Sequence, residues 1–332
     1  MPSAFIIGGT GQIGHALQAR LAAEGWDVTL ASRRGAGGAA GHVSMDRDEP
    51  GALERALGPG ADLLVDCVAM GAGDAGRLLA VQDRVGRLVA VSSASVYADA
   101  RGRTLDEAPE CGFPTLPVPI PVHHPTVAPG PRTYSTRKVA MERRLLDEAR
   151  IPVTVLRPCA IHGPFSRHAR EWWFVKRLLD GRRRIPLAYG GRSRFQTTST
   201  AAIAGAVLHA AGGEGASVLN VADADAPSVA EIGQAIMGVM GRRAELVGLP
   251  DAPFPPMLGA TPWSVAAPFV CAPSAPPAGT YAQTVPPAIR WLVEAVRGRD
   301  WREALPQLAA YPRDHFDYAA EDRALRAAAR RG

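Results

Sequence analysis

A tyrosine and a lysine lie four residues apart at the start of a segment with helical periodicity. They are Tyr134 and Lys138, in the string YSTRK. In a helix this spacing places the phenol and the ammonium group on one face, a turn apart. A phenol with a pKa of about 10 is protonated at neutral pH, and a nearby cation lowers that pKa by stabilising the phenolate. We therefore expect Tyr134, assisted by Lys138, to exchange a proton with an alcohol or a carbonyl group.

A glycine-rich string near the N-terminus separates an apolar run from a segment with helical periodicity. It reads Gly8-Gly9-Thr10-Gly11-Gln12-Ile13-Gly14. In a strand–turn–helix context, such a string aims backbone N–H groups and the positive end of a helix dipole at a phosphate. Gly8 would permit the tight turn, Gly11 the close approach to phosphate, and Gly14 the packing of helix on strand. The string predicts a dinucleotide site.

The residues after the second predicted strand (residues 27–31) indicate which dinucleotide would bind. They are Ser32, Arg33 and Arg34, where an NAD site usually has an acid. A hydroxyl and planar guanidinium groups suit the 2′-phosphate of NADP. NADP is therefore favoured over NAD, and a solvated loop is the alternative. Asp46 is a candidate contact for the adenine or an ordinary surface residue.

The elements that must position these residues alternate along the first half of the chain. Apolar runs at 4–7, 27–31, 62–69, 87–92 and 153–157 predict strands, and the segments 12–24, 52–57 and 135–150 predict helices. This alternation predicts an α/β fold with a doubly wound parallel Rossmann sheet. A serine-rich turn follows the run 87–92, and its hydroxyls would point into the crevice where ligands of such sheets bind. We expect Ser92 and Ser95 to cap this turn.

Two proline-rich segments, at residues 111–131 and 250–287, interrupt the pattern. Proline cannot continue a helix or a central strand, so both predict loops. The first lies just before YSTRK and is a candidate lid over the substrate. We expect residues 1–180 to form the nucleotide-binding domain and residues 181–332 a smaller capping part, some segments of which return to the first domain. Helices are predicted at 172–179, 201–211, 229–240, 288–296 and 300–308, and a strand at 218–221.

Composition and charge limit the remaining classes of function. The net charge is +5, but the densest basic clusters, 182–184 and 330–331, are short and carry no interleaved aromatics, so no nucleic-acid partner is predicted. There is no apolar stretch of membrane-spanning length. The four cysteines are widely spaced, which suggests reduced thiols and a cytoplasmic location. His123 and His124 have no third ligand at suitable spacing, so no metal is predicted.

Four strings taken together, GGTGQIG, SSASVY, YSTRK and LRPCAIHGP, resemble the extended short-chain dehydrogenase/reductase family, which includes nucleotide-sugar epimerases and dehydratases. The resemblance covers roughly residues 4–240. It implies Ser93, Tyr134 and Lys138 as catalytic residues. It also implies an NAD(P)-dependent oxidoreductase that moves hydride to or from a secondary alcohol or carbonyl of a polar, sugar-like or nucleotide-linked small molecule. An epimerase that retains its cofactor is the alternative, and a non-catalytic NADP-sensing or RNA-associated protein is the second.

The resemblance completes the predicted site. It adds Val68 and Ala69 beneath the cofactor, Pro158 near the nicotinamide and Lys138 as a ribose ligand, and it suggests a homodimer. The predicted cofactor-binding set is Gly8, Thr10, Gly11, Gln12, Ile13, Gly14, Ser32, Arg33, Arg34, Asp46, Val68, Ala69, Lys138 and Pro158. Two departures concern the substrate. Ala160 replaces the family's usual Asn, and Arg194, a candidate phosphate ligand, is not followed by the usual His and acids.

Overall fold

The computed structural model describes residues 1–33, 41–250, 258–310 and 314–330 of the 332-residue chain. These residues form two compact units. Unit 1 contains Met1–Cys159, Thr200–Ala222 and Cys271–Ala278, and unit 2 contains Ala160–Ser199, Asp223–Val270 and Gly279–Gly332. The border after Cys159 precedes the predicted border at residue 180, and two later segments return to unit 1.

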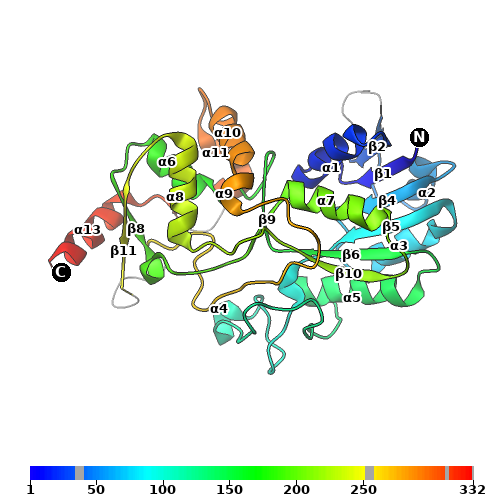
Figure 1. Ribbon diagram of the computed structural model, residues 1–332, viewed down its shortest axis with the longest axis horizontal. Helices are drawn as coiled ribbons and strands as arrows, with labels where there is room; N and C mark the ends of the chain where they lie inside the picture. The colour runs from blue at the N-terminus through cyan, green and yellow to red at the C-terminus, as the bar shows by residue number, and fades with distance from the viewer. Residues whose placement is uncertain (34–40, 251–257, 311–313, 331–332) are drawn as a thin grey trace. The chain divides into compact units, whose positions relative to one another are not determined.

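Unit 1 is built on one seven-stranded parallel sheet (Figure 1). Its strands are β1 (Ser3–Ile7), β2 (Asp27–Ser32), β3 (His42–Ser44), β4 (Ala61–Asp66), β5 (Val85–Val91), β6 (Val153–Pro158) and β10 (Ser217–Val221). The order across the sheet is β10-β6-β5-β4-β1-β2-β3, and every neighbouring pair is parallel. The chain therefore runs outward from β1 to β3 and then outward on the other side from β4. The predicted doubly wound sheet is confirmed.

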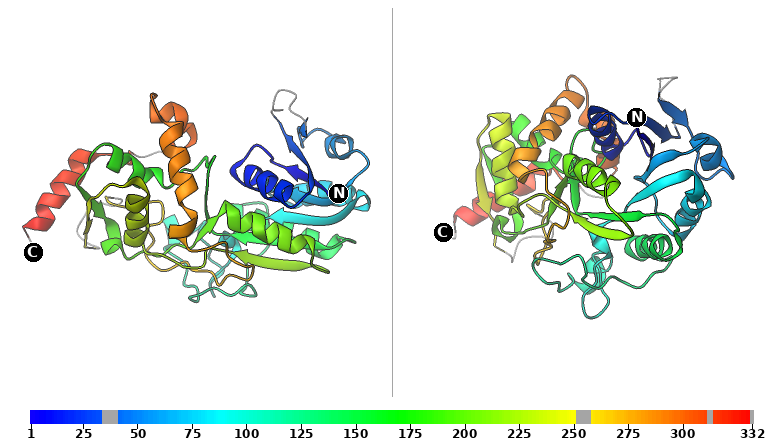
Figure 2. Two further views of the ribbon diagram at one scale, coloured as in Figure 1. Left: turned by 45° about the horizontal axis from the view of Figure 1, so that its top comes forward. Right: turned by 45° about the vertical axis from the view of Figure 1, so that its right-hand side comes forward.

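Helices cover both faces of this sheet (Figures 1 and 2). On one face α1 (Gln12–Ala23) packs against α7 (Thr200–Ala211), and on the other α3 (Ala72–Ala80) packs against α5 (Tyr134–Glu148). The second face also carries α2 (Ala52–Leu57), whose leucines share an apolar core with α5. Because the sheet is buried on both faces, its strands are continuous apolar runs, which made them visible in the sequence. Short elements complete the unit: η1 (Gln82–Arg84), η2 (Ala94–Val96) and α4 (Ala108–Cys111).

Helix α5, which carries the YSTRK string, begins at a well-defined cap. Thr133 accepts a hydrogen bond from the backbone N–H of Thr136, and the Thr136 side chain accepts one from the N–H of Thr133 in return. This reciprocal cap fixes the first turn of the helix and therefore the position of Tyr134, its first residue. Helix α3, by contrast, was not predicted. Glycines 73 and 76 lie inside it, and glycine is a poor helix former.

The first proline-rich segment contains neither helix nor strand between residues 112 and 133. Its middle is nevertheless anchored to unit 1. Ile120 is fully buried, its backbone pairs with Cys271, and its carbonyl accepts a hydrogen bond from the Asn220 side chain at 3.3 Å. The middle of the segment is therefore fixed to unit 1 at Ile120.

Unit 2 is mainly helical. Its helices are α6 (Trp172–Leu179), α8 (Val229–Met240), α9 (Tyr281–Thr284), α10 (Pro286–Ala295), α11 (Trp301–Ala304), α12 (Pro306–Ala309) and α13 (Tyr318–Ala329). Two small parallel sheets pair β7 (Ala160–His162) with β9 (Thr197–Ser199), and β8 (Arg184–Leu187) with β11 (Glu245–Gly248), and η3 spans Ala188–Gly191. The helix predicted over 300–308 is two short helices, because Pro306 lacks the N–H needed to continue the first.

The core of unit 2 forms around α6. Trp172, Trp173 and Phe174 are buried there together with residues of α8 and α10. The tryptophan pair is thus packed in the core, as is usual for such pairs at helical positions. Of the described residues, none belongs to a helix that is both long and apolar enough to cross a lipid bilayer.

Candidate active site

The glycine string forms the turn between β1 and α1, and three of its glycines are required by geometry. Gly8 has a φ of +85°, a value that favours glycine, and it lies against Val68. A Cβ atom on Gly9 would lie 2.6 Å from the Cβ of Leu30. One on Gly14 would lie 2.4 Å from the carbonyl oxygen of Gly9, so the helix packs directly on the turn. Each of these positions excludes a larger residue.

The start of α1 has the properties of an anion site. Gly11 is the N-cap and supplies no side chain to the free N–H groups of the first turn, which also contains no acid. Uncapped donors and a positive helix end fit the pyrophosphate of a dinucleotide. The turn therefore has room and polarity for the predicted group.

The end of β2 is polar and carries no acid at Ser32 or Arg33. The hydroxyl of Ser32 lies 2.8 Å from Nε2 of His42 on β3, and Arg33 is exposed. His15 of α1 is near this pair. Burial lowers its pKa, and the charge of His42 lowers it further. Arg34, the other predicted ligand, lies outside the described residues. Asp46 is exposed and accepts a hydrogen bond from the backbone of Asp48 at 3.0 Å.

Ser93 and Tyr134 meet at the carboxyl edge of the sheet. Ser93 follows β5 and accepts a hydrogen bond from the backbone of Ser95 at 3.1 Å, and its side chain is also hydrogen-bonded to Tyr134. The Ser95 carbonyl in turn accepts a hydrogen bond from Ser135 at 2.9 Å, which ties the turn to α5. The predicted hydroxyl and phenol are thus adjacent, and Tyr134 is 38% exposed, so a ligand can reach it.

The pKa of Tyr134 differs from the expectation. Burial raises it above its ordinary value and Asp106 adds to the rise, whereas the hydrogen bond with Ser93 and the charge of Arg137 lower it. Without a bound cofactor, Lys138 is not among the groups that lower the pKa of Tyr134. The ammonium group lies 5.8 Å from the centre of the phenol ring, beneath it rather than at the hydroxyl.

Lys138 is instead directed at the ends of two strands. Its ammonium group donates to the carbonyl oxygens of Ala69 at 2.6 Å and Val91 at 2.9 Å. Burial lowers its pKa to about 8, although the carboxylates of Asp66 and Glu142 oppose the fall. An ammonium group has three donors, so one is left for a ligand.

Asp66 holds the strand end on which Lys138 rests. It is fully buried at the end of β4 and accepts hydrogen bonds at 2.8 Å from the backbone N–H groups of both Val68 and Ala69. Arg47 donates to both of its carboxylate oxygens, at 2.6 and 3.3 Å. The predicted cofactor residues Val68 and Ala69 are therefore fixed beside the glycine turn by a buried ion pair.

A second buried ion pair lies on the other side of Lys138. Glu142, one turn further along α5, is bound by Arg157 of β6 at 2.6 Å and accepts a hydrogen bond from Ser92. Arg157 also donates to the hydroxyl of Tyr97 at 3.2 Å. Ser92, which was predicted to cap the turn, instead joins β5 to α5 through Glu142. The turn is capped by Ser93.

Sequence reasoning missed these four charged residues, Arg47, Asp66, Glu142 and Arg157. Asp66 and Arg157 had a signal in the sequence, because each interrupts an otherwise apolar run (LLVDC and VLRP). Charges inside buried strands are rare unless they are paired. Nothing in the sequence identified Arg47 as the partner of Asp66.

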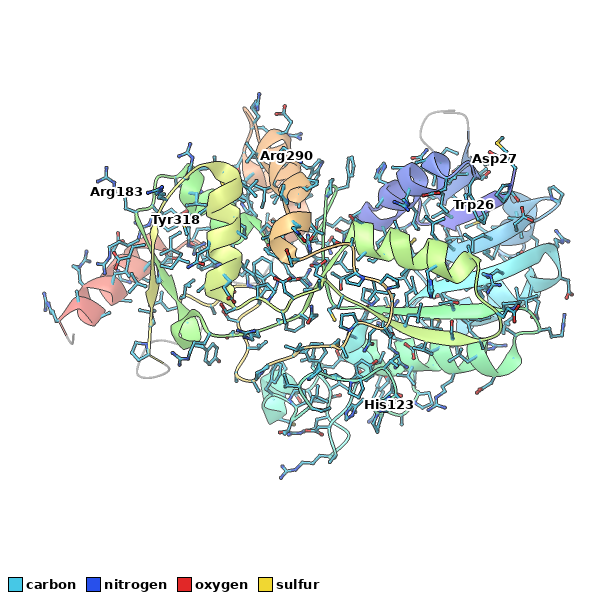
Figure 3. The ribbon with its side chains drawn as sticks, in the orientation of Figure 1. Trp26, Asp27, His123, Arg183, Arg290 and Tyr318 are labelled. Carbon is cyan, nitrogen blue, oxygen red and sulfur yellow. The ribbon has the colours of Figure 1, made fainter. Side chains whose placement is uncertain are left out.

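The remaining predicted residues belong to β6, to unit 2 and to the proline-rich loop. Pro158 ends β6, next to β5 in the same sheet. Arg194 belongs to unit 2, where it is exposed and donates to the carbonyl of Ala226 at 3.0 Å. His123 lies on the surface of the proline-rich loop (Figure 3), and His124 contacts the carbonyl of Ala98 at 3.0 Å. In the part of the chain that the structure describes, no three His, Cys, Asp or Glu side chains converge where a metal ion could be held.

Comparisons with known proteins agree with this arrangement. Residues 4–80 match the NAD dependent epimerase/dehydratase family. The predicted resemblance is thereby confirmed in sequence over this segment, and over the rest of the chain the similarity to solved structures is one of fold. No curated protein matches the sequence.

Solved structures similar to this chain include three proteins that act on or bind nucleotide sugars. MoeE5, solved with UDP-glucose and NAD, has a TM-score of 0.63 at 19% identity over 89% of this chain and 99% of its own. The UDP-N-acetylglucosamine 4-epimerase from Bacillus cereus has a TM-score of 0.65 at 14% identity over 87% and 99%. The UDP-glucose 4-epimerase from Thermotoga maritima, with UDP-glucose, has 0.64 at 14% over 89% and 100%.

Proposed function

We propose that this protein is an NAD(P)-dependent oxidoreductase acting on a secondary alcohol or carbonyl group of a polar, sugar-like small molecule. The observation that carries the proposal is the contact between Ser93 and Tyr134, with Lys138 one turn below. A nicotinamide dinucleotide held at the glycine turn would donate or accept the hydride. The residues at the turn fit its pyrophosphate, because the first turn of α1 is uncapped and free of acids.

Each of the three side chains has a distinct role in this proposal. Ser93 donates a hydrogen bond to the reacting oxygen and positions it beside the phenol. Tyr134 supplies a proton to that oxygen during reduction or removes it during oxidation. Lys138 uses its remaining donor for a ribose hydroxyl and keeps a positive charge beneath the phenol.

The raised pKa of Tyr134 keeps the phenol in the form that reduction of a carbonyl group requires. Burial and Asp106 keep the phenol protonated at neutral pH in the chain alone. A protonated phenol is prepared to donate to the oxygen of a carbonyl as hydride reaches its carbon. We propose net reduction of a carbonyl group as the first candidate activity, with the protonated phenol as the proton donor.

We further propose that the preferred cofactor is NADP. Ser32 and Arg33 stand where an acid would be needed to hold the 2′-hydroxyl of NAD, and His42 orients the Ser32 hydroxyl at 2.8 Å. Guanidinium and hydroxyl groups suit a phosphate ester.

A homodimer and a cytoplasmic location stay predictions.

An epimerase that retains its cofactor is the second candidate. The observation in its favour is that the similar solved structures include UDP-sugar 4-epimerases. Two features disfavour a nucleotide-diphospho-sugar substrate. Ala160 and the segment after Arg194 both depart from the family's usual residues. The third reading, a non-catalytic NADP-sensing or RNA-associated protein, is disfavoured because it gives no role to the contact between Ser93 and Tyr134.

Mass spectrometry of the purified protein under native conditions tests the proposal. We expect a dinucleotide that exchanges freely, carries a 2′-phosphate and is consumed in its reduced form when a carbonyl substrate is added. A tightly retained dinucleotide with no net consumption would instead identify the epimerase. Failure of the chain to bind either dinucleotide would refute both enzymatic readings.

A further inference from the structure

Four arginines from two distant segments surround one pocket of unit 2. Arg182, Arg183 and Arg184 lie between α6 and β8, and Arg326 lies on α13, more than 140 residues later. Together with Asp322 and Leu325 they line a pocket of about 260 Å³, which we call the arginine pocket. Figure 3 shows Arg183 at the surface of unit 2. The sequence contained only the short cluster at 182–184, and the fold adds the fourth arginine.

Two ion pairs dock α13 and thereby assemble the pocket. Arg177 of α6 and Glu321 of α13 are both buried and paired. Beside them, Arg182 binds Asp322 through two hydrogen bonds. The arrangement of the arginines therefore rests on a buried anchor, while Arg183 and Arg326 are exposed and form no ion pair within the described residues.

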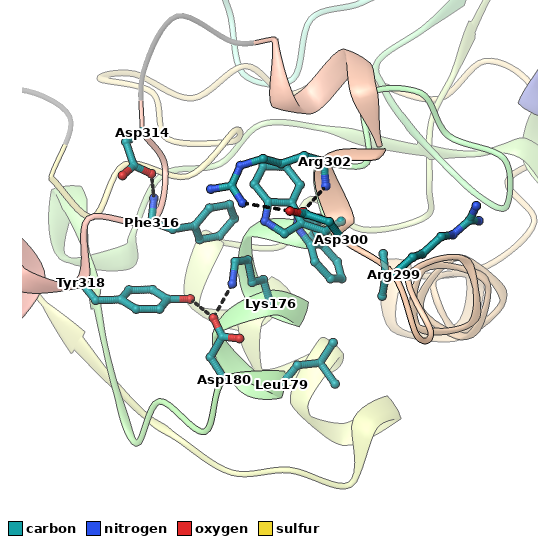
Figure 4. Close-up of a pocket in the computed structure, with 12 residues that line it drawn as sticks. Lys176, Leu179, Asp180, Arg299, Asp300, Arg302, Asp314, Phe316 and Tyr318 are labelled. Carbon is teal, nitrogen blue, oxygen red and sulfur yellow. Dashed lines mark hydrogen bonds and ion pairs between the residues drawn. The ribbon is translucent and has the colours of Figure 1, made fainter. Parts of the chain in front are cut away.

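The charge of the arginine pocket is unbalanced. Four arginines face one carboxylate, Asp322, which leaves a net charge of +3 on the lining residues. Glu245 at 2.9 Å from Arg184 reduces the excess, but it is largely exposed. Another pocket of unit 2, with a volume of about 440 Å³, differs in this respect (Figure 4). There Lys176 and Tyr318 both bind Asp180, and three cations are matched by three carboxylates.

One of the arginines that line the pocket has a side-chain nitrogen without a partner. The Nε of Arg182 is buried and, within the described residues, has no hydrogen-bond acceptor. Buried donors are normally satisfied by protein, water or a ligand. An anionic ligand is therefore indicated by the excess of arginines that line the pocket, and not by this atom.

We propose that the arginine pocket binds the phosphoryl group of a small phosphorylated molecule. Planar guanidinium groups bind phosphate through paired hydrogen bonds, and Arg183 and Arg326, which form no ion pair within the described residues, are the two best placed to do so. The volume is slightly below the roughly 300–1,000 Å³ of pockets for drug-sized ligands. Among the described residues, no aromatic side chain lines the pocket, so they offer no surface there on which nucleic-acid bases could stack. The site is independent of the proposed oxidoreductase activity.

The test is isothermal titration calorimetry of the full chain with inorganic pyrophosphate, in the presence of excess NADP to occupy the proposed dinucleotide site. Arg183→Ala/Arg326→Ala should weaken binding about tenfold or more, since two charge-assisted hydrogen bonds are lost. These two residues leave the ion pairs of α13 intact, so the variant should melt at the same temperature. Arg297→Ala/Arg302→Ala is the matched control, because it removes the same charge from exposed positions of unit 2 and should bind like the wild type.

Three outcomes would overturn the proposal. The first is no measurable binding of pyrophosphate to the wild-type chain. The second is equal weakening in both double variants, which would indicate general attraction by net charge. The third concerns a labelled single-stranded oligonucleotide followed by fluorescence anisotropy. If it binds more tightly than pyrophosphate and loses binding only in Arg183→Ala/Arg326→Ala, the ligand is a nucleic acid.

Discussion

Asp66 and Lys138 are joined through a single residue, Ala69. The backbone N–H of Ala69 donates to Asp66 at 2.8 Å, and its carbonyl accepts from the ammonium group of Lys138 at 2.6 Å. Of the groups that keep the lysine protonated, Asp66 has the largest effect. The carboxylate therefore fixes both the position and the charge of the lysine proposed to act beneath Tyr134.

This link predicts the pH dependence of the reaction. The pKa of Lys138 is about 8, below its ordinary value of 10.5, so turnover should fall as the pH rises through about 8. Stability should change in the opposite direction. Between these two values the unfolded chain binds more protons than the folded one, so the contribution of this lysine to stability rises with pH. Initial rates and unfolding midpoints measured across this range check both signs.

Asp66→Asn should shift the fall in turnover, which occurs near pH 8 in the wild type, to lower pH. Loss of the carboxylate removes a charge that raises the pKa of Lys138, so the ammonium group would deprotonate earlier. Asp62→Asn, at the exposed start of the same strand, is the control and should leave the profile unchanged. Identical profiles in the wild type and Asp66→Asn would show that the activity does not depend on a charged Lys138.

Tyr134→Phe should lower kcat by about 10²–10⁴-fold, the usual contribution of a positioned acid–base group. Dinucleotide binding and thermal stability should be retained, because the phenol hydroxyl is at the partly exposed edge of the sheet. Tyr189→Phe removes a similarly exposed hydroxyl in unit 2 and serves as the control. Turnover by Tyr134→Phe at the wild-type rate would remove the tyrosine from the mechanism.

Glu142→Gln tests the second buried ion pair. The substitution leaves the charge of Arg157 buried without its partner, which should cost about 3–5 kcal/mol of unfolding free energy. Glu148→Gln on the same helix breaks an exposed pair with Arg144 and should cost less than about 1 kcal/mol. Denaturant unfolding measures both. Equal losses in the two variants would contradict the structural importance assigned to Glu142.

The parts of the fold predicted from the sequence are those encoded locally. The glycine turn, the apolar strands of the sheet and the helix starting at Tyr134 each depend on neighbouring residues, and all three were found. Helix α3 was missed because its glycines lower its intrinsic propensity, and packing against α5 compensates for this loss. Local pattern is therefore a reliable guide only where tertiary contacts do not override it.

The charged parts of the candidate site could not be predicted, because their partners are distant in the chain. Arg47 and Asp66 pair only when β3 and β4 lie in one sheet, on opposite sides of β1 and β2. Likewise, Arg326 joins Arg182 only after α13 docks. The orientation of Lys138 could not be predicted for the same reason. Spacing placed it on the same face as Tyr134, but the carbonyl groups of other strands decide where its ammonium group points.

Arg33→Ala tests the cofactor preference. If Arg33 binds the 2′-phosphate, its loss removes a charge-assisted hydrogen bond and should raise the KM for NADP about tenfold or more, with little effect on NAD. Arg20→Ala removes an exposed arginine from α1 and is the control. Steady-state kinetics with each cofactor gives the ratio of the KM for NADP to the KM for NAD. An unchanged ratio would mean that Arg33 faces solvent and does not select the cofactor.

Gly14→Ala tests the glycine turn itself. The new Cβ atom would lie 2.4 Å from the carbonyl oxygen of Gly9 and 2.6 Å from its Cα, and backbone cannot move as a side chain can. Overpacking should cost about 1–3 kcal/mol and displace the start of α1, so dinucleotide binding should weaken as well. Gly73→Ala in α3 is the matched control. It meets no atom within 4 Å, and alanine should stabilise the helix by about 0.5–1 kcal/mol. Thermal unfolding should show that Gly14→Ala is destabilised and Gly73→Ala is stabilised. Dinucleotide titration should show weaker binding in Gly14→Ala alone. If Gly14→Ala changed neither stability nor binding, the close packing of α1 on the turn would be contradicted.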